Sequence, residues 1–324
     1  MFLFLLAIFL GLLLLIWSAD KFVDGATTLA VHFGMPTLLI GILIVGFGTS
    51  TPEIAIAIIA TLNGTYSLAI GNALGSNIAN IGLILGATAL VKPIVAHSRI
   101  VQKNLLLLLV IVLIIGYMLF DNTLVLTEGI ILVVGCLAFI FWSILVAKET
   151  KRDALVSDIK DEIKSMTMSL QQSIFFLLLG LMLLIISSQI LVWGSVGIAK
   201  ALGVSDLIIG LTIIALGTSL PELATSIVAV KKGESDIAIG NVVGSNIFNI
   251  LAVMGIATMI SPNQPITSEI FYRDWSVMFF LTMALIFITY EKKEENKIDT
   301  LRGAMLLFAY IAYTLYLGVT LPVS

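Results

Sequence analysis

Charged residues are scarce in this 324-residue chain: they make up 11% of it, whereas soluble domains carry roughly 25%. The chain therefore lacks the polar side chains needed to cover a water-facing surface. Hydrophobic residues make up 59% of it, and several apolar runs reach the ~20 residues that a bilayer-spanning helix needs. The sequence thus predicts a membrane protein and excludes a soluble enzyme and a nucleic-acid-binding protein.

Cysteine and histidine are also nearly absent. Cys136 is the single cysteine and lies inside an apolar run, so neither an internal disulfide nor a thiolate zinc site can form. The apolar runs contain no Ser/His pair and no metal-binding His pair, so intramembrane hydrolysis is not expected. The protein is predicted to be neither an enzyme nor dependent on a cofactor, and no obligatory protein partner is implied.

Hydropathy and turn signals divide the chain into about ten apolar spans, which predicts an all-α membrane protein with the lipid bilayer as its surroundings. The spans lie near residues 2–31, 37–62, 68–91, 104–120, 125–147, 172–199, 207–230, 237–260, 275–290 and 303–321. The first and sixth spans are long enough to tilt strongly. On the first span, Asp20, Lys21 and Asp24 are expected to form a local ion pair or to line a cavity rather than to bind a ligand.

Basic residues indicate the orientation, because Lys and Arg are retained on the cytoplasmic side of short loops. If both termini are placed on the outer side of the membrane, only Lys200 and Arg273 lie in outer loops, and Lys21 lies within a span. The remaining basic residues are all on the inside, and they are Lys92, Arg99, Lys103, Lys148, Lys151, Arg152, Lys160, Lys164, Lys231, Lys232, Lys292, Lys293, Lys297 and Arg302. The prediction is a multi-pass protein of the cell membrane with both termini outside.

The chain contains an internal repeat at an offset of 222 − 53 = 169 residues. IGILIVGFGTSTPEIAIAIIATLNG from Ile40 matches IGLTIIALGTSLPELATSIVAVKKG from Ile209, and AIGNALGSNIANI from Ala69 matches AIGNVVGSNIFNI from Ala238. Residues 1–148 and 171–324 are predicted as two repeats of five spans each, joined by a cytoplasmic linker at 149–170. An odd number of spans inverts the second copy, an architecture typical of secondary transporters with a substrate site near mid-membrane.

Glu53 and Glu222 are the acidic residues that cannot be moved into water by small changes of the span boundaries. An unpaired carboxylate at that depth costs about 2.5 to 3.5 kcal/mol on insertion scales. No Lys or Arg lies near either glutamate within its span. A bound cation is therefore predicted as their partner.

Each glutamate follows a proline that is expected to break its helix, in GTSTPE and in GTSLPE. Proline releases the carbonyl four positions earlier, here that of Gly48 or Gly217. Ser50 and Thr51 are expected to cap the half-helix that begins at Pro52. Carboxylates, carbonyls and hydroxyls are the ligands that a hard cation such as Ca²⁺ takes.

Further neutral oxygens occur one span later in each copy. In each copy, three polar residues spaced by four form one polar stripe on a helix. They are Asn72, Ser76 and Asn80 in the first copy and Asn241, Ser245 and Asn249 in the second. Glycines beside them should let a neighbouring helix approach closely, and these are Gly71, Gly75, Gly240 and Gly244. Such residues could serve only to join helices, but their occurrence in both copies, each after a buried glutamate, favours an ion pathway.

The doubled motifs, GTSTPE with GNALGSNIAN and GTSLPE with GNVVGSNIFN, resemble the paired alpha-repeats of the Ca²⁺/cation antiporter superfamily, which contains the sodium/calcium exchangers. The resemblance covers nearly the whole chain and is greatest to compact prokaryotic members of the YrbG type. It implies ten transmembrane helices in two inverted-topology five-helix repeats and exchange of Na⁺ for Ca²⁺, the transported ions.

The resemblance also implies the ion ligands. Calcium would be held by the carboxylates of Glu53 and Glu222 and by the backbone carbonyls of Thr49 and Thr218. Flanking sodium sites would use Ser50, Ser219, Ser76 and Ser245, with carbonyls from Gly46 and Ala215, and the second motif contributes Asn80 and Asn249. Some relatives carry Asp where this chain has Asn249, so potassium co-transport is disfavoured.

The sequence leaves two other transport functions open. A Ca²⁺/H⁺ antiporter could use the same fold, because a mid-membrane glutamate can cycle between protonated and ionised forms. A cation channel could use similar carboxylates and carbonyls.

Overall fold

The computed structural model describes residues 1–95, 99–154, 168–203, 215–289 and 297–320. Within these residues, nine helices are long and apolar enough to cross a membrane. They are Phe2–Phe33, Thr37–Leu62, Tyr66–Val91, Val101–Leu119, Leu126–Ala147, Leu170–Ala201, Ser235–Ile260, Ile270–Thr289 and Thr300–Thr320. The predicted span at 207–230 lies partly outside the described residues. The fold is that of an all-α membrane protein, as predicted.

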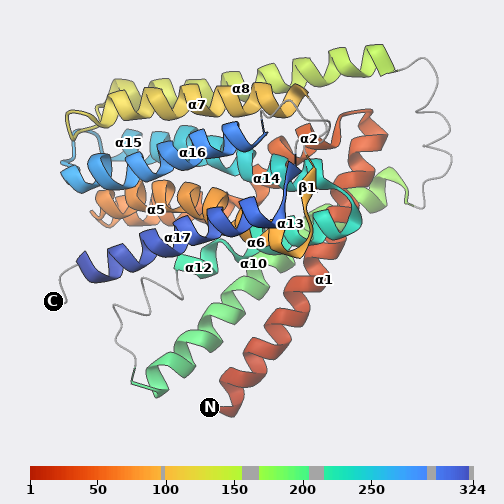
Figure 1. The fold of residues 1–324 in the computed structure, drawn as a ribbon, viewed down its shortest axis with the longest axis horizontal. Helices are drawn as coiled ribbons and strands as arrows, with labels where there is room; N and C mark the ends of the chain where they lie inside the picture. The colour runs from red at the N-terminus through yellow and green to blue at the C-terminus, as the bar shows by residue number, and fades with distance from the viewer. Residues whose placement is uncertain (96–98, 155–167, 204–214, 290–296, 321–324) are drawn as a thin grey trace.

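The elements form two similar series (Figure 1), in which η denotes a π-helical segment. The first is α1 Phe2–Phe33, α2 Thr37–Ile40, η1 Gly41–Gly46, α3 Phe47–Thr49, α4 Thr51–Leu62, α5 Tyr66–Ala79, η2 Asn80–Leu85, α6 Gly86–Val91, β1 Ile94–Val95, α7 Arg99–Leu119 and α8 Leu126–Ala154. The second is α10 Leu170–Ala201, α12 Ala215–Thr218, α13 Leu220–Lys232, α14 Ser235–Phe248, η4 Asn249–Met254, α15 Gly255–Ile260, η5 Ile270–Trp275, α16 Ser276–Thr289, β2 Lys297–Ile298 and α17 Thr300–Thr320.

Several equivalent elements in the middle of the two series begin one repeat offset apart. α5 begins at Tyr66 and α14 at Ser235, and 235 − 66 = 169. The change from α- to π-helix follows the same rule, since η2 begins at Asn80 and η4 at Asn249, and 249 − 80 = 169. These two spans are the most buried of the candidate spans, so the second motif of each copy lies at the centre of the molecule.

α1 and α10 lie side by side and extend beyond the other helices (Figure 1). Each has 32 residues. At 1.5 Å per residue this gives a length of about 48 Å, more than the ~30 Å hydrocarbon core, so both helices must tilt. The pair is in backbone contact: a Cβ on Gly25 would lie 2.6 Å from the nitrogen of Leu177. Glycine is therefore required at this crossing.

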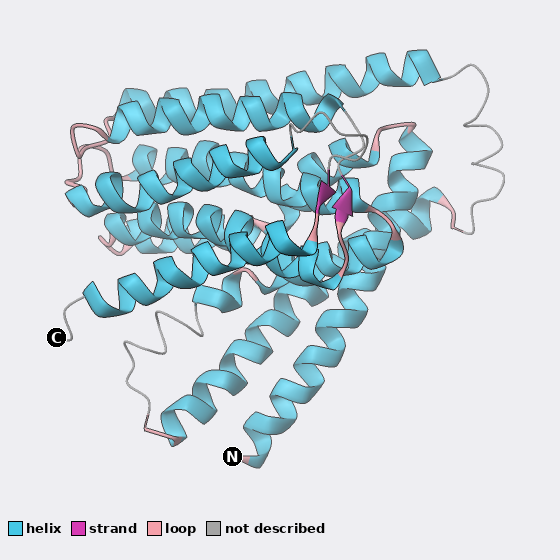
Figure 2. Ribbon diagram, viewed as in Figure 1, coloured by secondary structure: helices cyan, strands magenta, loops and turns pink. Residues whose placement is uncertain are grey.

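A short two-stranded sheet pairs β1 of the first series with β2 of the second (Figure 2). β1 and β2 are antiparallel, with Ile94 opposite Ile298 and Val95 opposite Lys297. The predicted linker at 149–170 begins as a continuation of helix, because α8 reaches Ala154, and α10 begins at Leu170. Residues 155–167 of the linker lie outside the described part of the chain.

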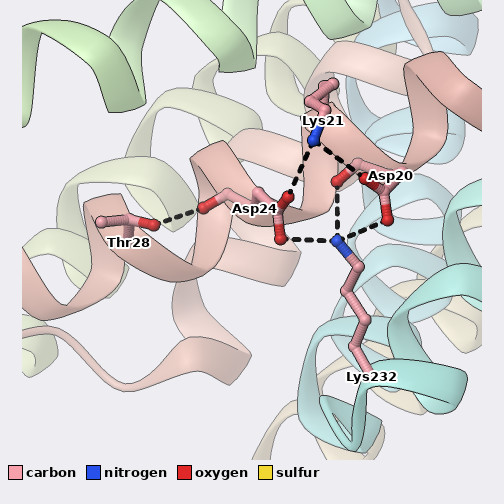
Figure 3. Close-up of polar contacts among 5 residues, drawn as sticks. All are labelled: Asp20, Lys21, Asp24, Thr28 and Lys232. Carbon is pink, nitrogen blue, oxygen red and sulfur yellow. Dashed lines mark hydrogen bonds and ion pairs between the residues drawn. The ribbon is translucent and has the colours of Figure 1, made fainter. Parts of the chain in front are cut away.

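An ion-pair cluster connects α1 with the end of α13 (Figure 3). Lys21 lies 3.1 Å from Asp20 and 3.6 Å from Asp24 on the same helix, so the predicted local ion pair is confirmed. Lys232 of α13 reaches the same carboxylates, at 2.7 Å from Asp20 and 2.5 Å from Asp24. The sequence did not indicate this fourth member, which fastens the helix carrying Glu222 to α1.

We expect Lys232→Gln to lower the free energy of unfolding only modestly, by about 1 kcal/mol, because partly exposed ion pairs are screened by solvent. The Lys232 side chain is 27% exposed, and Lys21 continues to neutralise the two aspartates. Thermal unfolding of the purified protein in detergent measures the change. Lys231→Gln removes the same charge at the exposed neighbouring position and is the matched control. An equal loss in both variants would show that the cluster contributes nothing specific.

Candidate cation site

Both GTSxPE motifs form the predicted helix breaks. Ser50, with φ −81° and ψ 1°, separates α3 from α4, and Ser219, with φ −92° and ψ 3°, separates α12 from α13. The Gly217 carbonyl, which Pro221 leaves without its usual donor, accepts a 2.6 Å hydrogen bond from Ser188 Oγ of α10. The repeat places Ala19 at the equivalent position on α1, since 188 − 19 = 169, so the first half has no hydroxyl there.

The prediction that Ser50 and Thr51 cap α4 through their side chains is wrong. Ser50 occupies the N-cap position, but its side chain accepts no cap hydrogen bond, and Thr51 Oγ1 donates backwards to the carbonyl of Phe47. The reason is the backbone of Ser50, which departs from the extended conformation that aims an N-cap hydroxyl at the first turn. The buried Ser50 Oγ is thereby left without a hydrogen-bond partner among the described residues.

Glu53 and Glu222 lie in the first turns of α4 and α13, and each is 1% exposed. Their carboxylates are close enough to interact electrostatically, and the Thr49 hydroxyl lies beside Glu222. One oxygen of each carboxylate, Oε2, has no hydrogen-bond partner within the described chain. The positive ends of the two half-helices favour the negative charge, but a buried carboxylate oxygen without a partner still requires a cation or a proton.

Thr49 and Asn241 connect the two breaks to α14. The Thr49 hydroxyl donates to Asn241 Oδ1 over 3.0 Å, and Asn241 Nδ2 donates to the backbone carbonyl of Glu222 over 3.2 Å and to Ser226 Oγ over 3.0 Å. Asn72 is the equivalent of Asn241, but Ala57 stands where Ser226 would be. Asn72 Nδ2 is buried without a partner in the described structure, so the two halves of the site differ.

Close packing of α14 against η1 brings Ser245 to Gly46. Ser245 Oγ donates to the Gly46 carbonyl over 3.1 Å. At Gly244 an added Cβ would lie 2.4 Å from the Ile42 carbonyl oxygen, and at Gly240 it would lie 2.6 Å from that of Leu38. The predicted close approach is confirmed at these two glycines. The segment that the repeat places opposite Gly71 and Gly75, around residues 207–214, lies outside the described residues.

Two asparagine pairs join the second motifs of the two halves. Asn80 Nδ2 donates to Asn246 Oδ1 over 2.9 Å, and Asn249 Nδ2 donates to Asn77 Oδ1 over 3.1 Å. The repeat relates one pair to the other, since 249 − 80 and 246 − 77 both equal 169. Asn77 and Asn246 were not identified as site residues from the sequence, although both occur in the repeated GSNI. Asn249 Oδ1 is buried and without a partner among the described residues, so it remains able to accept an ion.

Two cavities adjoin these residues. One, of about 540 Å³, lies among α4, α10 and α12 and is lined by Pro52, Ser188, Thr218 and Pro221. The other, of about 620 Å³, is lined by Asn72, Ser76, Thr218 and Ser219. Neither Glu53 nor Glu222 lines either of these two cavities, whereas Thr218, four residues before Glu222, lines both.

The sequence matches the family described as sodium/calcium exchanger protein over residues 3–145 and 172–319. The chain belongs to the sodium/calcium exchanger family. It is 44% identical to CaxA of Alkalimonas amylolytica, over 94% of this chain and 96% of that protein. It is 38% identical to the inner membrane protein YrbG of Escherichia coli strain K12, over 88% of each chain.

The fold of this exchanger family member is similar to a solved structure of the sodium-calcium exchanger NCX_Mj. The TM-score is 0.83 at 30% sequence identity, over 98% of this chain and 99% of the other. The family and the structure together establish a multi-pass integral membrane protein, and the expected resemblance is confirmed.

Most of the predicted ligands of this family member are buried, at the two helix breaks or on the second motifs of the two halves. Those that are buried are Glu53, Glu222, Thr49, Ser50, Ser219, Ser76, Ser245, Asn80, Asn249 and Gly46. Thr218 is only partly buried and lines both cavities. Ala215 is the first residue of α12. Among the described residues, no group of three or more His, Cys, Asp or Glu side chains is placed to hold a metal.

Proposed function

We propose that the protein exchanges Na⁺ for Ca²⁺ by alternating access, with both ions competing for one site built on Glu53 and Glu222. The observation that carries this proposal is the pair of enclosed carboxylates, each with an oxygen left without a partner among the described residues. Ca²⁺ takes about six to eight oxygen ligands. The serine hydroxyls and the carbonyl of Gly46 could complete such a set for Ca²⁺ or for Na⁺.

The charge of the site provides the coupling. Two carboxylates balance one Ca²⁺ or a set of Na⁺ ions, so binding of one cargo excludes the other. With neither cargo, two like charges would remain unpaired in a low-dielectric interior, and that state should resist the change between inward- and outward-open forms. Exchange is then obligatory. Asn249 adds no third charge, which supports a site without potassium.

The repeat suggests how access alternates. We assign residues 1–148 and 171–324 to two inverted repeats, 149–170 to a cytoplasmic linker, and both termini to the outside. The shared offset of helix boundaries supports this division. α1 and α10, which pack mainly on each other and extend beyond the other helices, are the elements proposed to move past the buried α5 and α14.

Names given to relatives support the choice of ions. The sodium/calcium exchanger MaX1 of Methanosarcina acetivorans is 28% identical over 96% of this chain and 97% of its own. NCX_Mj, the structural neighbour, is also named a sodium-calcium exchanger.

Calcium uptake into proteoliposomes, driven by a sodium gradient at clamped pH, tests the proposal. We expect uptake that follows the sodium gradient and stops when the gradient is removed. Uptake that ignores sodium but follows a pH gradient would instead identify a Ca²⁺/H⁺ antiporter. Calcium flux that persists without any counter-cation on the opposite side would identify a channel.

A further inference from the structure

A third buried carboxylate lies outside both motifs. Among the described residues, the acidic side chains that are buried are Glu53, Glu222 and Asp274. Asp274 is 6% exposed and lies on the π-helical η5, at the start of the span Ile270–Thr289. The mechanism proposed above does not use it. A carboxylate buried at the end of a span needs partners for its oxygens, so its surroundings are informative.

Both oxygens of Asp274 accept hydrogen bonds from cationic or hydroxyl partners. Arg273 Nε donates to Oδ1 over 2.6 Å, and Arg273 Nη2 donates to Oδ2 over 3.1 Å. The Tyr313 hydroxyl of α17 donates to Oδ1 over 2.8 Å. The Arg273 side chain is 23% exposed, whereas that of Asp274 is 9% exposed. The guanidinium is therefore the less enclosed of the two charged groups and the one freer to move, while Tyr313 can hold the carboxylate in place.

The cavity of about 620 Å³ connects this group with the candidate cation site. Ser76 and Ser219, both proposed sodium ligands, line it together with Arg273, Asp274 and Tyr313. Asn72, another lining residue, has a buried side-chain nitrogen without a partner among the described residues. Within a largely apolar lining, these polar side chains place two proposed sodium ligands and the Asp274 carboxylate on the same cavity.

A purely structural ion pair explains these contacts less fully. Burying a charged pair gains little over apolar packing, because desolvation offsets the attraction. The neighbouring η5 residues Phe271 and Trp275 already stack on each other, with ring centroids 5.0 Å apart, and hold the segment by apolar contact. The charges instead face the cavity that leads to the ion ligands.

We propose that Arg273, Asp274 and Tyr313 form an access gate for cations that reach the Glu53–Glu222 site through this cavity. Asp274 attracts the cation, and Arg273 opposes it until the cation replaces the guanidinium at the carboxylate. This inference rests on the proposed function for the identity of the site to which the route leads. The gate acts at one face of the membrane only, the face on which Arg273 lies.

Calcium/calcium exchange in right-side-out and inside-out membrane vesicles tests the gate. For Arg273→Gln we expect the half-saturating calcium concentration at the Arg273 face to fall about three- to tenfold, because one repelling charge is removed from a partly hydrated cavity. For Asp274→Asn we expect a rise of similar size. At the opposite face of the membrane, neither variant should change the half-saturating calcium concentration. Calcium/calcium exchange requires no sodium, so the result is independent of whether sodium or a proton is the counter-ion.

A variant that keeps the charge separates the gate from a structural role. Arg273→Lys keeps the positive charge and should retain near-wild-type half-saturation. Equal changes at both faces, or a loss of maximal rate and of folded protein without a change in half-saturation, would overturn the proposal. Loss of sodium-driven uptake in the wild type would contradict the proposed function but would leave the one-sided effect measurable.

Discussion

Glu53→Gln and Glu222→Gln are each expected to abolish sodium-driven calcium uptake, with a loss of about 100-fold or more. In the proposed function, each change removes one of the two charges that would balance Ca²⁺ in a buried site, where electrostatic interactions are much stronger than in bulk water. Glutamine retains the size of the side chain and relieves the burial of an unpartnered carboxylate, so the variants should still insert and fold. Radiolabelled calcium uptake into proteoliposomes measures the loss.

Size-exclusion chromatography and thermal unfolding provide the control for these two variants. We expect both to remain monodisperse and to unfold at or above the wild-type temperature, because a buried ionisable group has become neutral. Glu269→Gln, the same change at an exposed position, should leave transport intact. Retained calcium transport in Glu53→Gln or Glu222→Gln would remove the central claim about the site.

Gly244→Ala is expected to have the second large effect, at least a tenfold loss of transport and a lower unfolding temperature. The added methyl group would lie 2.4 Å from the carbonyl oxygen of Ile42, and backbone cannot move aside as a side-chain end can. Overpacking of this kind costs about 1–3 kcal/mol, and more where the contact is rigid. The required separation of α14 from η1 would also pull Ser245 away from Gly46.

Gly135→Ala provides the matched control on α8. Its added Cβ would lie 3.6 Å from Leu251 Cδ2, an ordinary van der Waals contact with a flexible side chain. Alanine also favours a helix over glycine by about 0.8–1 kcal/mol, so this variant should be as stable as the wild type or more stable. A Gly244→Ala protein with normal transport and stability would show that η1 and α14 are not held in backbone contact.

The local features of the two motifs could be predicted from the sequence. A proline next to a glutamate inside an apolar span predicts a helix break and a buried carboxylate; the breaks occur at Ser50 and Ser219, and the buried carboxylates are those of Glu53 and Glu222. The repeat then implied a second copy of every feature. The side-chain cap at Ser50 failed because hydroxyl direction depends on the φ and ψ angles that packing imposes on one residue.

The features missed are contacts between residues far apart in the chain. Nothing near Lys232 indicates that it reaches Asp20 and Asp24 on the first helix. Likewise, Asn77 and Asn246 acquire their hydrogen-bond partners only because the two second-motif helices pack against each other. Tyr313 contacts Asp274 only because α17 packs beside η5. Sequence periodicity gives the face of a helix, but not the neighbour against which that face packs.

The sequence by itself determined the membrane location, the duplication and the two carboxylates, because the scarcity of charge leaves few acidic residues without access to water. The tertiary structure decided how these parts are arranged: which buried oxygens remain without partners among the described residues, which asparagines pair across the repeat, and which cavity is lined by both Ser219 and Asp274. Hydrophobic burial selects the spans residue by residue. Distances between side chains arise only after glycine contacts such as that of Gly244 with Ile42 have fixed the helix crossings.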